Sequence, residues 1–437
     1  MVFRHPPGMV ATMDAEAHPM SNPARRDRQN PLEPHGKLLV IGFAVAGVIV
    51  LIVWVLWFIA IIPSGVDQSG TPVGWDFRAF HSAATLLSRG ETTAMYDLAW
   101  PADLDGPPFA NPPFTAVLFL PFVAMGVVPA WVVWTVISVG AMAIGFRALD
   151  VPSWPLATGA ALLTVPVFFA LRLGQTSLLV FMLMSLGYAA LRSGRFRVAG
   201  AVLGLVVFKP QLLVGFVFWW LSRWRTMRPA IVGAFATGGT LIAVSLILLP
   251  FAWVGFLEAA SRLPELYAFG DSPYYEFAMW NLVVTDGPAN PTFISALSLA
   301  LTIGAGLALV WFVRRVRDDL PLAYAGAVVV GLIAAAHLVV HDWTLLLIAG
   351  VLVWQRLPQH RVAWASMGVV LLLTTIFSPF LLLYQLEALG AGFNAAPAVL
   401  LVCAVAAAVI AVGAVDAEGP IGHEPVQIER PQVTRKL

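Results

Sequence analysis

The sequence predicts an all-α polytopic membrane protein with about 10–12 transmembrane helices. Of its 437 residues, 59% are apolar and 11% are charged, and the mean hydropathy is +0.83. Soluble domains carry about 25% charged residues, so this composition excludes a water-soluble enzyme, a disordered protein and a free-standing nucleic-acid binder. The formal net charge of +1 gives no reason to expect nucleic acid as a partner. Cys403 is the single cysteine, so the chain has no disulfide framework and no cysteine-based metal site.

A polar tail, residues 1–37, precedes the first long apolar run, residues 38–62. The run has 25 residues without a charge, which is enough for a helix to cross a hydrocarbon core of about 30 Å. A signal peptide would have a shorter apolar region and a small-residue cleavage site. Because basic residues stand directly before the run, the positive-inside bias predicts a membrane anchor with a cytoplasmic N-terminal tail.

The later spans are predicted from apolar runs and from the basic clusters between them. The runs lie near residues 112–127, 129–146, 154–171, 176–191, 198–221, 229–250, 292–313, 321–340, 343–355, 362–383 and 395–415. Basic clusters at 192–197, 223–228, 314–317 and 356–361 are expected to face the cytoplasm. The alternation leaves a cytoplasmic C-terminal tail, residues 416–437, and predicts one membrane domain over residues 38–415.

Two polar segments, residues 63–111 and 251–290, are unusually acidic. Together they hold 11 of the 24 acidic residues but only 3 of the 25 lysines and arginines. This asymmetry predicts that both segments are extracytoplasmic loops that face each other at the membrane surface.

The apolar run 198–221 is interrupted by Lys209 and Pro210, and it separates two basic clusters that are both expected in the cytoplasm. About 11 helical residues reach only about 16 Å, half of the hydrocarbon core. A broken or re-entrant helix pair with Lys209 at its tip resolves the conflict, and it also requires one segment between residues 112 and 191 to be short. An intramembrane lysine is a functional-site hypothesis and a suitable partner for a phosphate. The alternative is a lysine that snorkels to the interface.

Asp76 lies in the stretch Gly74-Trp75-Asp76-Phe77, shortly after the first span. Aromatic neighbours would anchor a short interfacial helix at headgroup height. A partly desolvated carboxylate there has a raised pKa and can act as a general base. The alternative is a solvated acid paired with Arg78.

Three other polar features are weaker signals. Asn111 precedes a double proline that is typical of a helix start. Asp103 and Asp105 have the spacing of a metal-binding carboxylate pair, but without a nearby histidine such acids are usually solvent-facing. Gly174 permits a tight turn, after which Gln175 can contact a ligand hydroxyl or can simply belong to a polar turn.

His337 and His341 are four residues apart, so we expect them to share a helix face next to Asp342. Metal binding, hydrogen bonding to a ligand and helix-end packing are all open. Since the chain has no H-E-x-x-H pattern and no suitable thiol, we expect no metal and no cofactor.

The order of these motifs resembles glycosyltransferase family 87, integral membrane enzymes of the GT-C class. The resemblance covers roughly residues 38–380 and rests on Gly74-Trp75-Asp76-Phe77, Tyr96-Asp97, Asn111-Pro112-Pro113, Gly174-Gln175, Ala199-Gly200 with Lys209-Pro210, Trp280-Asn281 and residues 337–342. It implies a GT-C-like bundle for residues 38–415, with short interfacial helices in the first extracytoplasmic loop. Asn111 and His341 depart from the aromatic residues that the family usually shows.

The resemblance implies an inverting transfer of a sugar, with mannose as the first candidate, from a polyprenyl-phosphate-linked donor to a hydroxyl of a lipid or glycan acceptor. The enzyme would act in glycolipid biosynthesis at the outer face of the inner (plasma) membrane. Asp76 would be the general base. The residues at motif positions expected to contact substrate are Asn111, Gln175, Lys209, Asn281, His337 and Asp342.

The alternative function is a transporter or flippase of a lipid-linked sugar. Transporters usually show internal repeats and paired ionisable residues near the bilayer midplane. This chain shows no visible repeat, and its acids are concentrated outside the spans. A purely structural subunit would leave Asp76 and Lys209 unexplained.

Overall fold

The computed structural model describes residues 72–97, 104–261, 291–335, 337–380 and 396–418, together with Ile52, Leu56 and Ala60. Every regular element in these ranges is a helix, so the predicted all-α class is confirmed. The N-terminal tail, most of the first predicted span and the chain beyond residue 418 lie outside the described residues.

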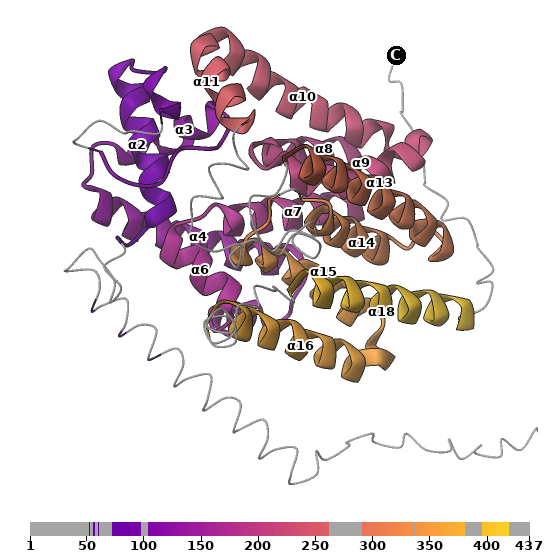
Figure 1. Cartoon of the computed structure of the whole chain (residues 1–437). Coiled ribbons are helices and arrows are strands. Elements are labelled where there is room, and N and C mark those ends of the chain that lie inside the picture. The colour runs from indigo at the N-terminus through magenta and orange to yellow at the C-terminus, as the bar shows by residue number, and fades with distance from the viewer. Residues whose placement is uncertain are drawn as a thin grey trace, which may run out of the picture. The chain divides into compact units, whose positions relative to one another are not determined.

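The helices are, in chain order, α2 (Trp75–Arg89), α3 (Phe114–Phe119), α4 (Val127–Ala148), α5 (Trp154–Ala161), α6 (Val165–Leu173), α7 (Ser177–Arg192), α8 (Phe196–Gly204), α9 (Val214–Ser222), α10 (Trp224–Leu248), α11 (Pro250–Ser261), α13 (Pro291–Arg315), α14 (Leu320–Ile333), α15 (Leu346–Arg356), α16 (Arg361–Phe380) and α18 (Ala396–Ala417) (Figure 1). Short 3-10 helices are η1 (Ala94–Tyr96), η2 (Leu120–Phe122), η3 (Leu205–Phe208), η4 (Pro210–Leu213), η7 (Val340–Leu345) and η8 (Pro358–His360).

Several helices are long and apolar enough to cross a membrane, so the chain is a polytopic membrane protein. In the described residues there are 4 such helices, namely α4, α10, α18 and the Ser295–Arg315 part of α13. The pair α5 and α6 would add a fifth, although it is bent by 76°. Other apolar stretches form shorter helices, among them α7 and α14, so the described residues alone do not reach the predicted 10–12 spans.

The apolar run 112–127 is not a membrane-spanning helix. It forms the six-residue α3 and then η2, which contains Pro121 near its start. Proline removes a backbone donor and interrupts the helix, so the run ends after two short pieces. A short segment between residues 112 and 191 was predicted from the alternation of charges, and α3 supplies one.

The apolar run around Lys209 is broken, as predicted. The backbone of Lys209 is not helical (φ −127°, ψ 65°), and this residue separates η3 from η4. The missing N–H of Pro210 explains why a continuous helix stops here.

Helices α8 and α10 pack side by side (Figure 1). A Cβ built on Gly200 would overlap the carbonyl oxygen of Ala230, and one on Gly204 would lie 2.6 Å from that of Ala234. The contacts advance along both helices in the same direction, so the two helices are parallel and their first turns lie near each other. The intervening chain must therefore return to the level from which it started, which fits a re-entrant pair, and the membrane placement of this pair stays a prediction.

Two of the three aromatic residues of α2 pack inside the protein and so do not act as the predicted anchors, whereas Trp75 is half-buried; the interfacial position of the helix itself stays a prediction. Phe77 and Phe80 are buried in a core with α3, η2 and α4, and the Phe80 ring stacks on Phe119 at 4.6 Å between centroids. Enough apolar surface lies in the neighbouring helices to cover α2, a tertiary effect that the local pattern does not reveal. The two acidic segments do meet, since the Tyr96 ring lies 6.0 Å from that of Phe256 in α11.

Candidate active site

Asp76 is placed by the start of α2. Gly74 adopts a left-handed backbone (φ 64°) directly before the helix, and its N–H donates to the carbonyl of Arg172 at the end of α6 (3.0 Å). A Cβ on Gly74 would lie 2.7 Å from Cδ1 of Trp131. Glycine is therefore required at this close approach, and Asp76, in the first turn of α2, is held against the end of α6.

Gln175 follows the predicted tight turn. Gly174 ends α6 with a left-handed backbone (φ 73°), and a Cβ on it would lie 2.5 Å from the Cβ of Phe77. The indole N–H of Trp131 donates to the carbonyl of Leu171 (3.0 Å), and that of Trp134 donates to the carbonyl of Gln175 (3.4 Å). Two tryptophans of α4 thus fix the turn.

The turn brings Gln175 to Asp76, 99 residues away in sequence, and its Nε2 donates to Oδ2 of Asp76 at 2.6 Å. Burial raises the pKa of the Asp76 carboxyl, while the bond from Gln175 and the positive charges of Lys209 and His337 partly oppose the rise. The alternative pairing of Asp76 with Arg78 is wrong.

Arg78 binds elsewhere. Its guanidinium forms an ion pair with Asp105 and also donates to the carbonyl of Val73. This pairing occupies the carboxyl of Asp105, and Asp103, its proposed metal-binding neighbour, lies outside the described residues.

Lys209 is buried (8% exposed), so the snorkelling alternative is wrong. Its Nζ donates to Oδ1 of Asp342 at 2.7 Å and to Oγ of Ser177 at 3.3 Å. The hydroxyl of Ser177 in turn donates to the same carboxylate oxygen at 2.8 Å. A cation, a hydroxyl and a carboxylate from three distant parts of the chain therefore form a closed cluster.

His337 and His341 do not share a helix face, contrary to the prediction. Helix α14 ends at Ile333, the backbone is extended at Val339, and η7 starts only at Val340. The β-branched pair at 339–340 favours this extended entry into the short helix. His341 is buried with Nε2 3.7 Å from Oδ2 of Asp342, and its Nδ1 has no hydrogen-bond partner in the described structure.

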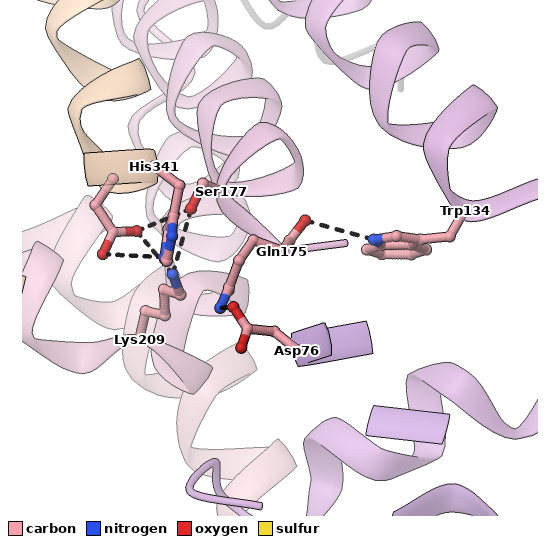
Figure 2. A network of polar contacts seen from close by, with 7 residues as sticks. Asp76, Trp134, Gln175, Ser177, Lys209 and His341 are labelled. Atoms are coloured by element: carbon pink, nitrogen blue, oxygen red, sulfur yellow. Dashed lines mark hydrogen bonds and ion pairs between the residues drawn. The ribbon is translucent and has the colours of Figure 1, made fainter. Parts of the chain in front are cut away.

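Figure 2 shows the resulting arrangement, with Gln175 pointing to Asp76 on one side and Lys209, Ser177 and His341 together on the other. His337 is half-buried and near enough to act electrostatically on Asp76.

Of the two predicted asparagines, Asn111 is described, and its recorded hydrogen bond lies outside this network. The carbonyl of Asn111 accepts the Tyr96 hydroxyl at 2.7 Å, and no contact of its side chain with Asp76 or Lys209 is seen in the described part of the chain. Asn281 lies outside the described residues.

Ser177 and Trp134 were missed by the sequence analysis. The only signal for Ser177 was a polar residue two positions after Gln175 at the start of an apolar run, which ordinary helix caps also show. Trp134 had no signal, since its indole contacts a backbone carbonyl 41 residues away. No group of three or more metal-ligating side chains is found in the described ranges.

The sequence profile of glycosyltransferase family 87 matches residues 109–340, more than half of the 437-residue chain. No curated protein and no solved structure shows a significant match. The matched range includes Gln175, Lys209 and His337, while Asp76 precedes it and Asp342 follows it closely.

Proposed function

The chain belongs to glycosyltransferase family 87, a GT-C-type family of membrane enzymes, and on that premise we propose which reaction this membrane glycosyltransferase performs. A sugar, mannose in the first instance, passes from a polyprenyl-phosphate-linked donor to a hydroxyl of a lipid or glycan acceptor. The transfer inverts the anomeric centre and needs no cofactor.

The observation that carries this proposal is the half-buried carboxyl of Asp76 within electrostatic reach of the buried ammonium of Lys209. Asp76 takes the proton of the acceptor hydroxyl while that oxygen attacks the anomeric carbon. The bond from this carbon to the phosphate oxygen breaks, and polyprenyl phosphate leaves with the electron pair. Lys209 and His337 stabilise the negative charge of the departing phosphate.

Of the other residues proposed to contact substrate, two are supported by hydrogen bonds in the structure and two by their motif positions. Gln175 and Asp342 are hydrogen-bonded to Asp76 and Lys209, so they border the place where substrate must sit. Asn111 and Asn281 are proposed from their motif positions alone.

We place the reaction at the extracytoplasmic face of the inner (plasma) membrane. The acidic composition of residues 63–111 and 251–290 supports this side. The contact between Tyr96 and Phe256 supports a shared face for the two segments, and Asp76 belongs to the first of them.

The test is release of free polyprenyl phosphate by the purified protein. Wild type and Asp76→Asn are given a panel of polyprenyl-phosphate sugars with a membrane-lipid acceptor extract. We expect release by wild type from one donor and a loss of at least about 100-fold in the variant, because general-base catalysis contributes roughly 100- to 10,000-fold.

A Glu91→Gln variant, changed at an exposed acid of the same loop, controls for loss of loop charge. If neither wild type nor variant releases the carrier, but proteoliposomes containing either move the lipid-linked sugar across the bilayer, the transferase proposal fails and the transporter replaces it.

A further inference from the structure

The turn between α6 and α7, residues 175–177, touches both charged groups of the site. Gln175 donates to Asp76, and Ser177 contacts Lys209. Asp76 and Lys209 come from separate parts of the chain, yet the two residues that hold them are separated only by Thr176. Figure 2 shows Gln175 on the side of Asp76 and Ser177 on the side of Lys209.

The backbone of this turn is itself fixed at several points. The N–H of Gln175 donates to the carbonyl of Ala170 (2.8 Å), and its carbonyl accepts the indole of Trp134 (3.4 Å). The carbonyl of Thr176 accepts the N–H of Val180 (3.0 Å), and Thr176 and Ser177 are buried. The backbone of this turn is therefore held in place, so the side chains of Gln175 and Ser177 can hold Asp76 and Lys209 in defined positions.

On the first side, the Gln175 amide bond restricts the Asp76 carboxylate. It occupies Oδ2, so Oδ1 is the carboxylate oxygen that does not accept from Gln175. Groups that act electrostatically on this carboxyl are Lys209, His337 and Asp342. The bond from Gln175 is the one direct hydrogen bond to it that the described structure gives.

On the second side, Ser177 and Asp342 together bind the ammonium group of Lys209. The oxygen of Ser177 accepts from the ammonium while its O–H donates to Asp342, so both polar functions of the hydroxyl are used. The direction of the ammonium is therefore set by two residues, of which only Ser177 lies on the turn.

We propose that residues 175–177 are a positioning element that sets the separation between the base Asp76 and the cation Lys209. The inference rests on the transfer reaction proposed above. An in-line displacement needs its base and its leaving-group cation at opposite sides of the anomeric carbon, and a displacement of about 1 Å can reduce the rate about 100-fold. A single rigid turn that holds both groups meets this requirement.

The test uses the two halves of the turn separately, in the full-length purified enzyme, with carrier release measured against pH and donor concentration. Gln175→Met removes the amide donor. We expect kcat to fall by roughly 10- to 100-fold. The acid limb, which is the fall of kcat on the acidic side of its pH profile, should shift to higher pH by about half a unit to one unit, since the lost bond favours the ionised carboxylate. The KM for the donor should stay within about twofold of the wild-type value, because Lys209 keeps its contacts with Ser177 and Asp342.

Ser177→Ala should give the opposite pattern. The donor KM rises by roughly 5- to 10-fold, because the ammonium loses a hydrogen-bond partner, and the acid limb stays at the wild-type pH. Gln175→Glu, which conserves size, should move the acid limb further up than Gln175→Met, since two carboxyl groups in contact share a proton. It also serves as the second variant if Gln175→Met does not fold.

Gln355→Met and Ser185→Ala are matched controls. The first removes an amide bond to the carbonyl of Leu149, and the second removes a buried hydroxyl on the same helix as Ser177. Neither should change the pH profile or the KM. If both turn variants lose activity with an unchanged acid limb and an unchanged KM, the turn is only structural and the inference is overturned. Absence of carrier release by wild type would instead refute the reaction itself.

Discussion

At the scale of single residues, the ion pair of Lys209 and Asp342 dominates the energetics of the site. Only 9% of the Lys209 side chain and 4% of the Asp342 side chain are exposed. Removing such charges from water costs several kcal/mol per ion, and the pair is tolerated because its members satisfy each other and Ser177. Each partner therefore compensates the buried charge of the other.

Asp342→Asn should strongly destabilise the protein. The substitution leaves a buried ammonium without a counter-ion, which costs about 3–5 kcal/mol, and denaturant unfolding in detergent measures the loss. The double variant Asp342→Asn with Lys209→Met should recover much of it.

Asp318→Asn is the control, because it removes a half-exposed partner of Arg223 and should change stability by no more than about 1 kcal/mol. Equal losses in Asp342→Asn and Asp318→Asn would show that the buried pair is not worth more than a surface one.

The rate of the wild-type enzyme should fall in acid. Asp76 must be ionised to accept a proton, and burial raises its pKa above the ordinary value of 3.8. As the pH falls through this raised pKa, the carboxylate is protonated and the rate declines, so the decline begins at a higher pH than for an ordinary aspartate. A carrier-release profile that stays flat from about pH 8 to about pH 4 would contradict the role of Asp76.

At the scale of elements, close packing at glycines decides where the site residues stand. Gly74 and Gly174 let α2 and α6 meet at Trp131, and Gly200 and Gly204 let α8 approach α10. Small residues at helix interfaces are the usual means of close packing in membranes, where apolar burial gives little extra drive.

Gly200→Ala should destabilise the protein, although alanine favours a helix by about 1 kcal/mol. The new methyl would overlap the carbonyl of Ala230, so α8 and α10 must separate, at a cost of roughly 1–3 kcal/mol. Gly239→Ala on α10 is the matched control, since a Cβ there meets nothing within 4 Å, and it should be neutral or stabilising. Thermal unfolding in detergent compares the two. A stabilised Gly200→Ala would contradict the close contact.

The elements also show what could be predicted from sequence. The break at Lys209 and the turn at Gly174 were predicted because proline and glycine act locally. The burial of Phe77 and the extended entry into η7 were not, because they depend on which helices lie nearby. The bond between Gln175 and Asp76 spans 99 residues and left no local signal. Motif order indicated that both residues matter, but not that they touch.

At the scale of the whole membrane domain, ion pairs join the helix ends that carry the basic clusters. Arg192 pairs with Asp150 (2.6 Å), and Arg356 contacts Asp319 and Glu418. Arg223 pairs with Asp318, which links the cluster at 223–228 to the turn after α13. Together with the parallel packing of α8 and α10, these contacts are compatible with the prediction that the clusters at 192–197 and 223–228 share one side of the membrane.

Cysteine labelling should show this sidedness directly. In a Cys403→Ala background, Ser193→Cys and Arg225→Cys, both at exposed positions, should react with an impermeant maleimide only after cells are permeabilised. Glu91→Cys, exposed just beyond α2, should react in intact cells. Because residues 193 and 225 flank the broken helix pair, labelling on opposite sides would mean that residues 196–222 cross the membrane, and the re-entrant arrangement would be wrong. Labelling of all three only after permeabilisation would keep that arrangement but move Asp76, and with it the reaction, to the cytoplasmic face.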